Sequence, residues 1–501
     1  MKMCRLLLAL LLPLSLFSST LHLSLGANPS RINPLLATDS ASGEISGWIF
    51  NGLVKFDKDA NIVGDLAESW EFKEPTRLLF YLKKGVKWHD GKPFGADDVV
   101  FTYSLMKSPK IFTPYASDFR YVESVEAIDE YTVEVIYKEP YFKALSIWMM
   151  GILPKHLWQS VKDPMTSRLN KEPVGTGPYR LKSMQNSGDV LLSANDDYFE
   201  HRPNIDTIHY HFMPDPTTQF LMLKAKKLDL GSLTPLQRER QIDDSFMEFY
   251  RIVQMQGRGY TYLGFNLKDE KFSDIRVRKA IDMAIDKEEL IRILFFSHGK
   301  VCYGPFMPGT FAYPSTLPER RYDPQGAKRL LKEAGYDESN PLEFTISTNA
   351  NNSTRLYAAQ IIQHQLAKAG VKVKIRAMEW QAFLNTVVTP RRFEAILLGW
   401  SLGLIPDAYS LWHSDSDKLG GFNLVGYRNK DVDEMIEKAE RLTDLDAVGE
   451  LYRKMFHVIA EDRPYIFLYI PDSISAVNRK ITPVIPSITG IMHNQIDWIK
   501  P

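Results

Sequence analysis

The chain has 501 residues, which is more than a single hydrophobic core organises well, so we expect at least two lobes. Lysine and arginine together number 61, as do aspartate and glutamate, and the formal net charge is therefore zero. This balance predicts no basic face and argues against nucleic acid as a partner. The hydrophobic share of 44% is typical of a folded globular protein, and the aromatic share of 12% is enough to supply both cores and a ligand pocket.

The N-terminus has the pattern of a secretory signal. A positively charged start is followed by an apolar run over residues 6–12, which is too short to span a bilayer. We predict a signal peptide over residues 1–18, cut near Ser18 or Ser19, and export to the periplasm. The alternation of residues 20–25 predicts a first strand directly after the cut.

The first half of the chain, up to about residue 260, favours strands and turns with few helices. The acidic pair Asp97-Asp98 predicts the start of a helix, because carboxylates stabilise a helix N-terminus. Residues 123–136 alternate like a β-hairpin with its turn at Asp129 and Glu130. We therefore expect a β-rich first lobe.

The second half changes to alternating helices and strands. Helices are predicted over 276–285, from Asp286, from Asp323 to Gly335 and over 355–369, and strands over 342–347, 371–375, 394–400, 464–470 and 473–477. Strand, helix and strand in succession make a crossover unit, so we expect an α/β lobe with a largely parallel sheet.

No recognisable catalytic or metal-binding motif is present. The sequence lacks the spacings of a nucleophile elbow, a zinc protease, a C-x-x-C site and a P-loop. Cys4 precedes the apolar run, so it cannot be the lipid-bearing cysteine of a lipoprotein, and Cys302 would be alone in the mature chain. His209 and His211 share one face of a predicted strand, but no third ligand accompanies them, and we expect two half-exposed histidines and no metal site. We also expect no cofactor and no enzymatic activity.

Several short motifs, in the right order along the chain, resemble the extracellular solute-binding proteins of family 5, which deliver peptides to ABC importers. They are Asn51-Gly52-Leu53-Val54, Leu66-Ala67-Glu68-Ser69-Trp70, Lys84–Gly91, Pro173–Tyr179, Leu263-Gly264-Phe265-Asn266, Gly399–Asp407, Gly421-Phe422-Asn423 and Gly426-Tyr427-Arg428-Asn429. The resemblance covers nearly the whole mature chain. It implies an α/β fold of two lobes that close like a clamp, of the type II periplasmic-binding-protein class, with an extra subdomain in the first lobe.

The same resemblance implies the division of the chain. We expect a first lobe over 19–260, with the extra subdomain over about 55–165, a second lobe over 266–468, and a return to the first lobe over 474–501. The two crossings are expected near 259–265 and 468–475. The implied partners are a peptide ligand and the permease subunits of an ABC transporter, and we expect a monomer.

Candidate ligand-binding residues follow from the rule that ligands lie outside the carboxyl ends of strands in open α/β sheets. The strand over 342–347 delivers Asn351, Asn352 and Arg355 to that edge, and the strand over 394–400 delivers Trp400. Amides can bond a peptide backbone, and the indole offers flat apolar area. The asparagines can equally serve as caps and turns.

Other candidates come from the resemblance. In peptide-binding relatives an aspartate shortly after the tryptophan pairs with the α-ammonium group of the ligand. Gly403 stands at about that place here, so either Asp407 substitutes or the ligand is not a free-amine peptide. Asn423 and Tyr427 lie in motifs that match the family. Asp39 lies in a loop placed at the opposite wall of the cleft, although it can equally cap the helix that follows.

Two other functions remain open. One is a binder of a non-peptide ligand, such as a metal chelate, haem or an oligosaccharide, on the same scaffold. The other is a secreted hydrolase, which would need two acids converging in the cleft, and Asp407 is the one evident candidate.

Overall fold

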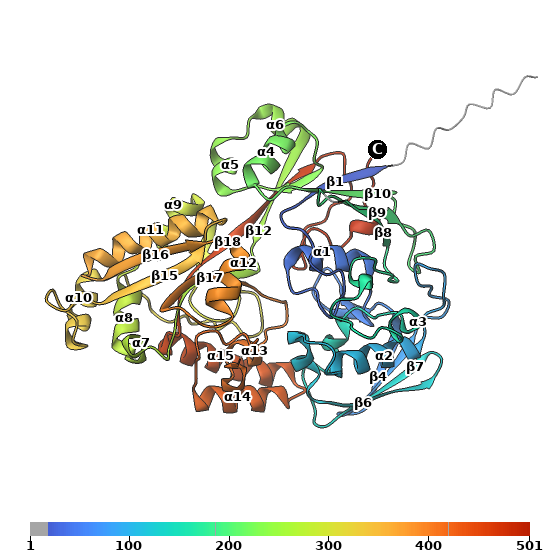
Figure 1. The fold of residues 1–501 in the computed structure, drawn as a ribbon, viewed down its shortest axis with the longest axis horizontal. Helices are drawn as coiled ribbons and strands as arrows, with labels where there is room; N and C mark the ends of the chain where they lie inside the picture. The colour runs from blue at the N-terminus through green and yellow to red at the C-terminus, as the bar shows by residue number, and fades with distance from the viewer. Residues whose placement is uncertain (1–18, 186, 419) are drawn as a thin grey trace, which may run out of the picture.

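The computed structural model describes residues 19–185, 187–418 and 420–501. The signal peptide predicted over residues 1–18 lies outside the described residues. The rest of the chain forms two lobes of mixed α and β structure, joined by long strands (Figure 1). The expectation of a two-lobe α/β clamp is confirmed.

One sheet of the first lobe contains the predicted first strand. Its order is β1 (Thr20–Leu25), β10 (Thr207–Phe212), β9 (Val190–Ala194) and β8 (Tyr179–Met184). β1 pairs with β10 in parallel, whereas the other pairs are antiparallel. Leucines 21, 23 and 25 of β1 are buried in the core of the lobe, and the residues between them lie on the other face of the sheet.

A second sheet of the first lobe forms the β-rich subdomain. Its antiparallel order is β4 (Ala67–Glu74), β5 (Arg77–Leu82), β7 (Thr132–Tyr137) and β6 (Val122–Asp129), and a small ribbon pairs β2 (Val54–Phe56) with β3 (Ile62–Gly64). The hairpin predicted over residues 123–136 is confirmed. The helices of the first lobe up to residue 158 are α1 (Ser40–Ile49), which packs on β8, and α2 (Ala96–Lys107), which packs on β6, β7 and α3 (Lys155–Trp158).

The helix predicted at Asp97-Asp98 is α2, but its cap is Gly95. The carboxylate of Asp98 accepts a hydrogen bond from the Gly95 backbone N–H at 3.1 Å and another from the Trp88 indole at 3.2 Å. Asp98 therefore satisfies the start of the helix from within the first turn.

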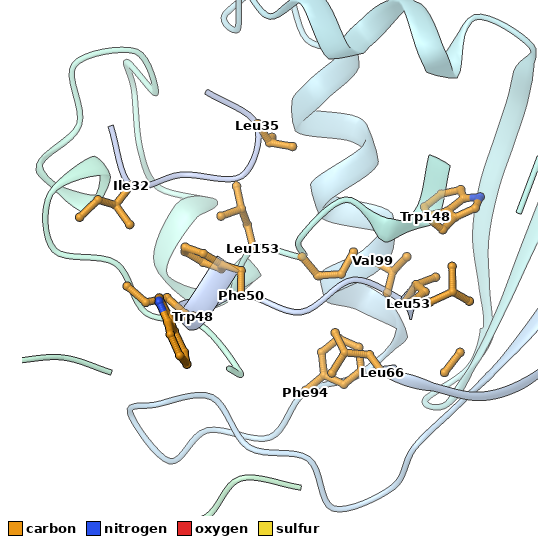
Figure 2. Close-up of a cluster of buried hydrophobic side chains, with 14 of the residues drawn as sticks. Ile32, Leu35, Trp48, Phe50, Leu53, Leu66, Phe94, Val99, Trp148 and Leu153 are labelled. Carbon is orange, nitrogen blue, oxygen red and sulfur yellow. The ribbon is translucent and has the colours of Figure 1, made fainter. Parts of the chain in front are cut away.

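A glycine-rich turn fastens α1 to the core of the first lobe. Gly175 and Gly177 pack directly against the end of α1, and the Gly177 N–H donates to the carbonyl oxygen of Ile49 at 2.8 Å. A Cβ atom on Gly177 would lie 2.4 Å from the carbonyl oxygen of Trp48. Figure 2 shows Trp48 and Phe50 at this end of α1, within the buried cluster that also holds Leu153.

The second lobe is built on a mixed sheet. Its strands are β13 (Gly259–Phe265), β14 (Gly299–Val301), β15 (Glu343–Asn349), β16 (Lys372–Met378), β17 (Ala395–Ser401) and part of β18 (Tyr465–Asn478). β15 is parallel to both β16 and β17, but β13 is antiparallel to β17 and β18. The prediction of a largely parallel sheet is therefore confirmed only for β15, β16 and β17, because β13 and β14 add antiparallel pairs with β17 and β18.

Helices cover both faces of this sheet. They are α7 (Glu270–Ser273), α8 (Ile275–Met283), α9 (Lys287–Phe295), α10 (Pro324–Glu333), α11 (Ser353–Lys368), α12 (Trp380–Phe383), α13 (Tyr409–Trp412), α14 (Lys430–Glu440) and α15 (Leu445–Asp462). The predicted caps Asp286 and Asp323 are confirmed, since each accepts a backbone N–H of its helix at 2.8 and 2.7 Å.

β18 runs as one continuous strand from one lobe to the other. Its first part pairs with β13 and β14, and its last part pairs with β12 (Tyr250–Gln256) and β11 (Leu230–Ser232). Tyr465 and Phe467 enter one core of the second lobe, whereas Ile466 and Leu468 enter the core on the opposite face. The period of two therefore lets one strand serve both cores.

The second connection between the lobes is short. β12 ends at Gln256 and β13 begins at Gly259, and β13 pairs with β17 along its whole length. This places the crossing just before residues 259–265. β12 packs with α6 (Asp244–Phe249), and both form a small separate core with α4 (Pro216–Lys224) and the end of β18. The short helix α5 (Pro235–Arg240) contributes no side chain to this core and lies near α9.

Short helical turns complete the fold. They are the 3-10 turns Pro114–Phe119, Ser146–Met149, Arg168–Asn170, Ser414–Ser416 and Gln495–Asp497, and a π-helical turn over Leu384–Val388. Within the part of the chain that is described, no helix combines the length and the apolar character needed to cross a membrane.

Candidate functional site

A cavity of about 420 Å³ lies between the two lobes. The first lobe contributes Leu25, Gly26, Ala27, Ser40, Ala41 and Glu44, and the second contributes Asn349, Asn351, Asn352, Arg355 and Trp380. The lining therefore joins the end of β1 and the first turns of α1 to the end of β15 and the start of α11. Its size falls within the range of ligand pockets, roughly 300–1,000 Å³.

Arg355 is the positive charge of this cavity. Its Nη1 donates to the side-chain oxygen of Asn349 at 2.7 Å, whereas its Nε is buried without a hydrogen-bond partner in the described structure. Burial lowers the pKa of the guanidinium, although it stays charged near neutral pH. Gly399 of β17 makes room for this group, because a Cβ atom there would lie 3.2 Å from Arg355 Nη2. An under-bonded buried guanidinium is suited to receive a carboxylate.

The two predicted asparagines also line the cavity. Asn352 caps α11 by accepting the Arg355 N–H at 2.8 Å, so it has the capping role that the sequence left open. Asn351 accepts a hydrogen bond from the Asn349 amide at 2.8 Å. These amides form a polar wall beside Arg355.

Glu44 supplies a negative charge from the opposite lobe. It lies on α1 and bonds the hydroxyl of the buried Tyr210. Glu44 is an exposed residue, yet the atoms packed around its carboxyl desolvate it and raise its pKa, and the bond to Tyr210 offsets this only in part. A cationic group entering the cavity would relieve that cost.

Asp39 has a structural role at the same wall. Its carboxylate accepts from the Ser42 N–H at 2.8 Å, from the Ser42 hydroxyl at 2.7 Å and from the Ser30 hydroxyl at 2.6 Å. It is thus the N-cap of α1. These hydrogen bonds lower its pKa even though burial opposes them, and they position the first turn of α1, which lines the cavity.

Trp400 is not among the residues that line this cavity. Adjacent residues of a strand face opposite sides of a sheet, so Trp400 lies on the side away from Gly399 and Arg355. Its indole N–H lies 3.3 Å from the Tyr465 hydroxyl, and its ring packs near Tyr262 and Phe422. The structure therefore joins Trp400 to an aromatic group of the second lobe.

Asp407 lies at a different contact between the lobes. Its Oδ1 accepts the N–H of Tyr409, the first residue of α13, at 3.0 Å, and its Oδ2 accepts from the hydroxyl of Ser410 at 2.6 Å. Its Oδ1 is also 3.4 Å from Nζ of Lys143, a buried residue of the first lobe. Burial would raise the pKa of Asp407, but Lys143 and the bonds to Ser410 hold it below its usual value.

Neighbouring pairs strengthen this second contact. Arg120 of the first lobe forms an ion pair with Glu440 of α14, and its guanidinium lies 3.8 Å from the centre of the Tyr409 ring. The backbone N–H of Phe142 donates to the carbonyl oxygen of Glu440 at 3.1 Å. Figure 1 shows α13 and α14 meeting the first lobe at this place. The two lobes are therefore already in contact here.

Asn423 and Tyr427 form hydrogen bonds within the second lobe. The Asn423 amide donates to the carbonyl oxygens of His413 and Tyr427 and accepts the Tyr427 N–H at 2.9 Å. The Tyr427 hydroxyl donates to Asp462 at 2.6 Å. Both residues are buried, and neither lines the cavity. Their motif builds a turn.

Glu44, Trp380 and the segment Leu25-Gly26-Ala27 all line the cavity but were not singled out from the sequence. A weak signal for Glu44 existed, because Ser40, Ala41 and Glu44 are spaced to share one face of a helix whose start faces the cleft. For Trp380, which begins α12, no sequence signal pointed to the cavity.

The chain matches a known family model over most of its length. Residues 61–421 match the model described as bacterial extracellular solute-binding proteins, family 5 Middle. The oligopeptide-binding protein AppA of Bacillus subtilis is 35% identical over 474 residues, which cover 90% of this chain and 86% of the relative.

Solved structures share the fold. The structure of Bacillus subtilis AppA in complex with a nonapeptide has a TM-score of 0.88 at 32% identity and covers 96% of this chain and 99% of that one. NikZ from Campylobacter jejuni in complex with Ni(L-His) has a TM-score of 0.87 at 27% identity, over 96% and 100% of the two chains.

Proposed function

Since the chain belongs to the bacterial extracellular solute-binding proteins of family 5, we propose that it binds a peptide between its lobes and delivers it to an ABC importer. The observation that carries this proposal is that one cavity is lined by a negative side chain from one lobe, Glu44, and by a positive side chain from the other, Arg355. A zwitterionic ligand such as a peptide has a positive and a negative end, and these two side chains are complementary to them in charge. The similarity to a nonapeptide complex supports the same class.

Binding proceeds by closure of the lobes. The ammonium group of the peptide pairs with Glu44, its carboxylate pairs with Arg355, and Asn351 and Asn352 bond the backbone between them. In this arrangement Asp407 does not serve as the ammonium partner, because Lys143 and the start of α13 occupy its oxygens. The described cavity lining contains one acidic side chain, so it offers no pair of carboxylates for hydrolysis.

The protein acts outside the cytoplasm in this proposal. The predicted signal peptide directs it to the periplasm, where it works as a monomer. The permease subunits of the importer then recognise the closed pair of lobes, and no covalent bond is made or broken.

The test is native mass spectrometry of protein purified from the periplasm of its source organism, followed by denaturation to release bound molecules. We expect short peptides. A metal chelate would instead favour the second candidate, which the similarity to NikZ with Ni(L-His) supports. Should the released ligand be haem or a sugar, the peptide proposal fails. If nothing is bound, calorimetric titration with defined peptides tests the proposal. The absence of measurable binding heat from all of these peptides would overturn it.

A further inference from the structure

Three histidines meet on the outer face of the first sheet, away from the ligand cavity. His22 lies on β1, and His209 and His211 lie on β10, the strand that pairs with it in parallel. In the register of this pair His22 is opposite His209, and Ser24 is opposite His211. The leucines of β1 point into the core, so the three imidazoles share the other face.

The three rings lie close enough to share one ion. One nitrogen from each ring can be chosen so that all three lie within 4.8 Å of one another. His22 Nδ1 and His211 Nε2 are already 3.0 Å apart. Zinc–nitrogen bonds of about 2.0–2.1 Å place two ligands of a tetrahedral ion about 3.3 Å apart, so small ring rotations suffice.

An aspartate orients two of the rings. Asp189 Oδ2 lies 3.2 Å from His209 Nε2 and 3.5 Å from His211 Nδ1, and its Oδ1 accepts the backbone N–H of Phe212 at 3.0 Å. On His211 this leaves Nε2, which lies 3.0 Å from His22 Nδ1, as the nitrogen that can bind an ion between the two rings. A carboxylate that holds one ring nitrogen while the other binds metal is the usual arrangement around histidine ligands.

We propose that His22, His209 and His211 form a binding site for a divalent transition-metal ion such as zinc, with Asp189 orienting the rings of His209 and His211. Imidazole and carboxylate ligands suit zinc, copper and nickel. The ion would join β1, which is an edge strand with β10 as its neighbour in the sheet, to the rest of the first lobe. The site would therefore stabilise the attachment of the N-terminal strand.

The charges around the cluster do not oppose a cation. Lys500 is the nearby basic group, and its Nζ is 2.6 Å from the carboxylate of Asp229, which also accepts the backbone N–H of His22 at 2.8 Å. Burial lowers the pKa of His22 and of His211, which favours the neutral form of the ring, the form that binds metals. His209 and His211 are about a fifth to a quarter exposed, so an ion can enter from solvent.

The experiment titrates zinc into chelator-treated protein that carries no histidine tag, and follows both binding heat and thermal unfolding. We expect one tight equivalent of zinc and a rise in Tm. The variants His209→Gln and His211→Gln should each lose about tenfold or more in affinity and most of the Tm shift, and Asp189→Asn should lose about tenfold.

Two controls separate this site from others. His201→Gln removes an exposed histidine of the same lobe that pairs with Asp497, and it should leave zinc binding unchanged. Arg355→Gln alters the ligand cavity, and it should also leave this zinc equivalent unchanged, so a metal bound as cargo in the cleft is distinguished from the proposed site. Circular dichroism of each variant confirms that it is folded.

A spectroscopic measurement reports the ligands directly. Cobalt(II) bound by three imidazoles and one oxygen in a tetrahedral site gives intense visible absorption, which should be absent from the folded His209→Gln/His211→Gln double variant. The proposal is overturned if the wild-type protein binds no zinc, or if the double variant binds it with unchanged affinity.

Discussion

Arg355 combines two properties that distinguish it from an ordinary surface arginine: it lines the cavity, and its Nε is buried without a partner. Replacing it with glutamine keeps a polar side chain but shortens it and removes the charge that receives the ligand carboxylate. We expect Arg355→Gln to weaken peptide binding by about 30-fold or more, which corresponds to about 2 kcal/mol.

Calorimetric titration with one peptide measures this loss. Arg292→Gln is the matched control, because Arg292 lies on α9, its side chain is 67% exposed and it does not line the cavity. Equal affinities for the two variants would rule out Arg355 as the carboxylate partner.

The free energy of unfolding should depend on pH through His89. Its Nδ1 accepts the N–H of Gly175 at 3.2 Å, and its Nε2 lies 3.0 Å from the carbonyl oxygen of Gly177, so the neutral ring is required. Burial lowers the pKa of His89 from 6.5 to about 4. Between these values the unfolded chain binds a proton that the folded chain excludes. Stability is therefore lost as the pH falls from 6.5 towards 4, by up to about 3 kcal/mol.

Urea unfolding at a series of pH values tests this effect. The variant His89→Asn should be less stable at pH 7 and should lose less stability than the wild type on acidification. The exposed His201→Asn should keep the wild-type dependence. If the stability of His89→Asn falls with pH as steeply as that of the wild type, another group causes the pH dependence.

At the scale of elements, the contact between α1 and the glycine turn positions one wall of the cavity. A Cβ atom at Gly177 would lie 2.4 Å from the carbonyl oxygen of Trp48, so Gly177→Ala must displace backbone and should destabilise the protein by about 1–3 kcal/mol. Gly47 lies inside α1 with no atom within 4 Å of such a Cβ.

Gly47→Ala is therefore the matched control, and it should stabilise the protein by about 0.5–1 kcal/mol, because alanine favours a helix. Thermal and urea unfolding of both variants measure the difference. Equal effects of the two substitutions would contradict the tight packing at Gly177.

At the scale of the whole molecule, the contact between Lys143 and Asp407 links the lobes outside the ligand cavity. Lys143 is buried and also lies 3.1 Å from Asp118 of its own lobe, so its charge is shared between two carboxylates. Removing one partner of such a pair leaves the other uncompensated. We expect Lys143→Met to reduce the equilibrium constant of lobe closure about 30-fold, or about 2 kcal/mol.

Small-angle scattering with saturating peptide measures closure as a decrease in the radius of gyration. The variant should remain more open than the wild type at the same ligand occupancy. Lys328→Met removes an exposed lysine that pairs with Glu338 within one lobe and should close normally. A fully closed Lys143→Met protein would show that this pair does not control the motion.

The sequence by itself determined much of the local structure. Asp286 and Asp323 cap the helices expected of them, Asp39 has the capping role that was one of two roles considered for it, and the strand over residues 20–25 and the hairpin at Asp129 are present. These features depend on hydrogen bonds between near neighbours and on apolar periodicity, so they can be read without knowledge of the fold. The length of the chain predicted more than one core, and the resemblance to the family predicted that these cores form two lobes.

The tertiary structure alone decided which residues meet. Arg355, Asn351 and Asn352 share a cavity with Glu44, whereas Trp400 faces the other side of its sheet and Asp407 is held by Lys143, about 260 residues earlier in the chain. The third histidine beside His209 and His211 is His22, which only the parallel pairing of β1 and β10 brings near. Such contacts depend on strand register and lobe closure, which bring together residues that are far apart in sequence, and no local pattern encodes them.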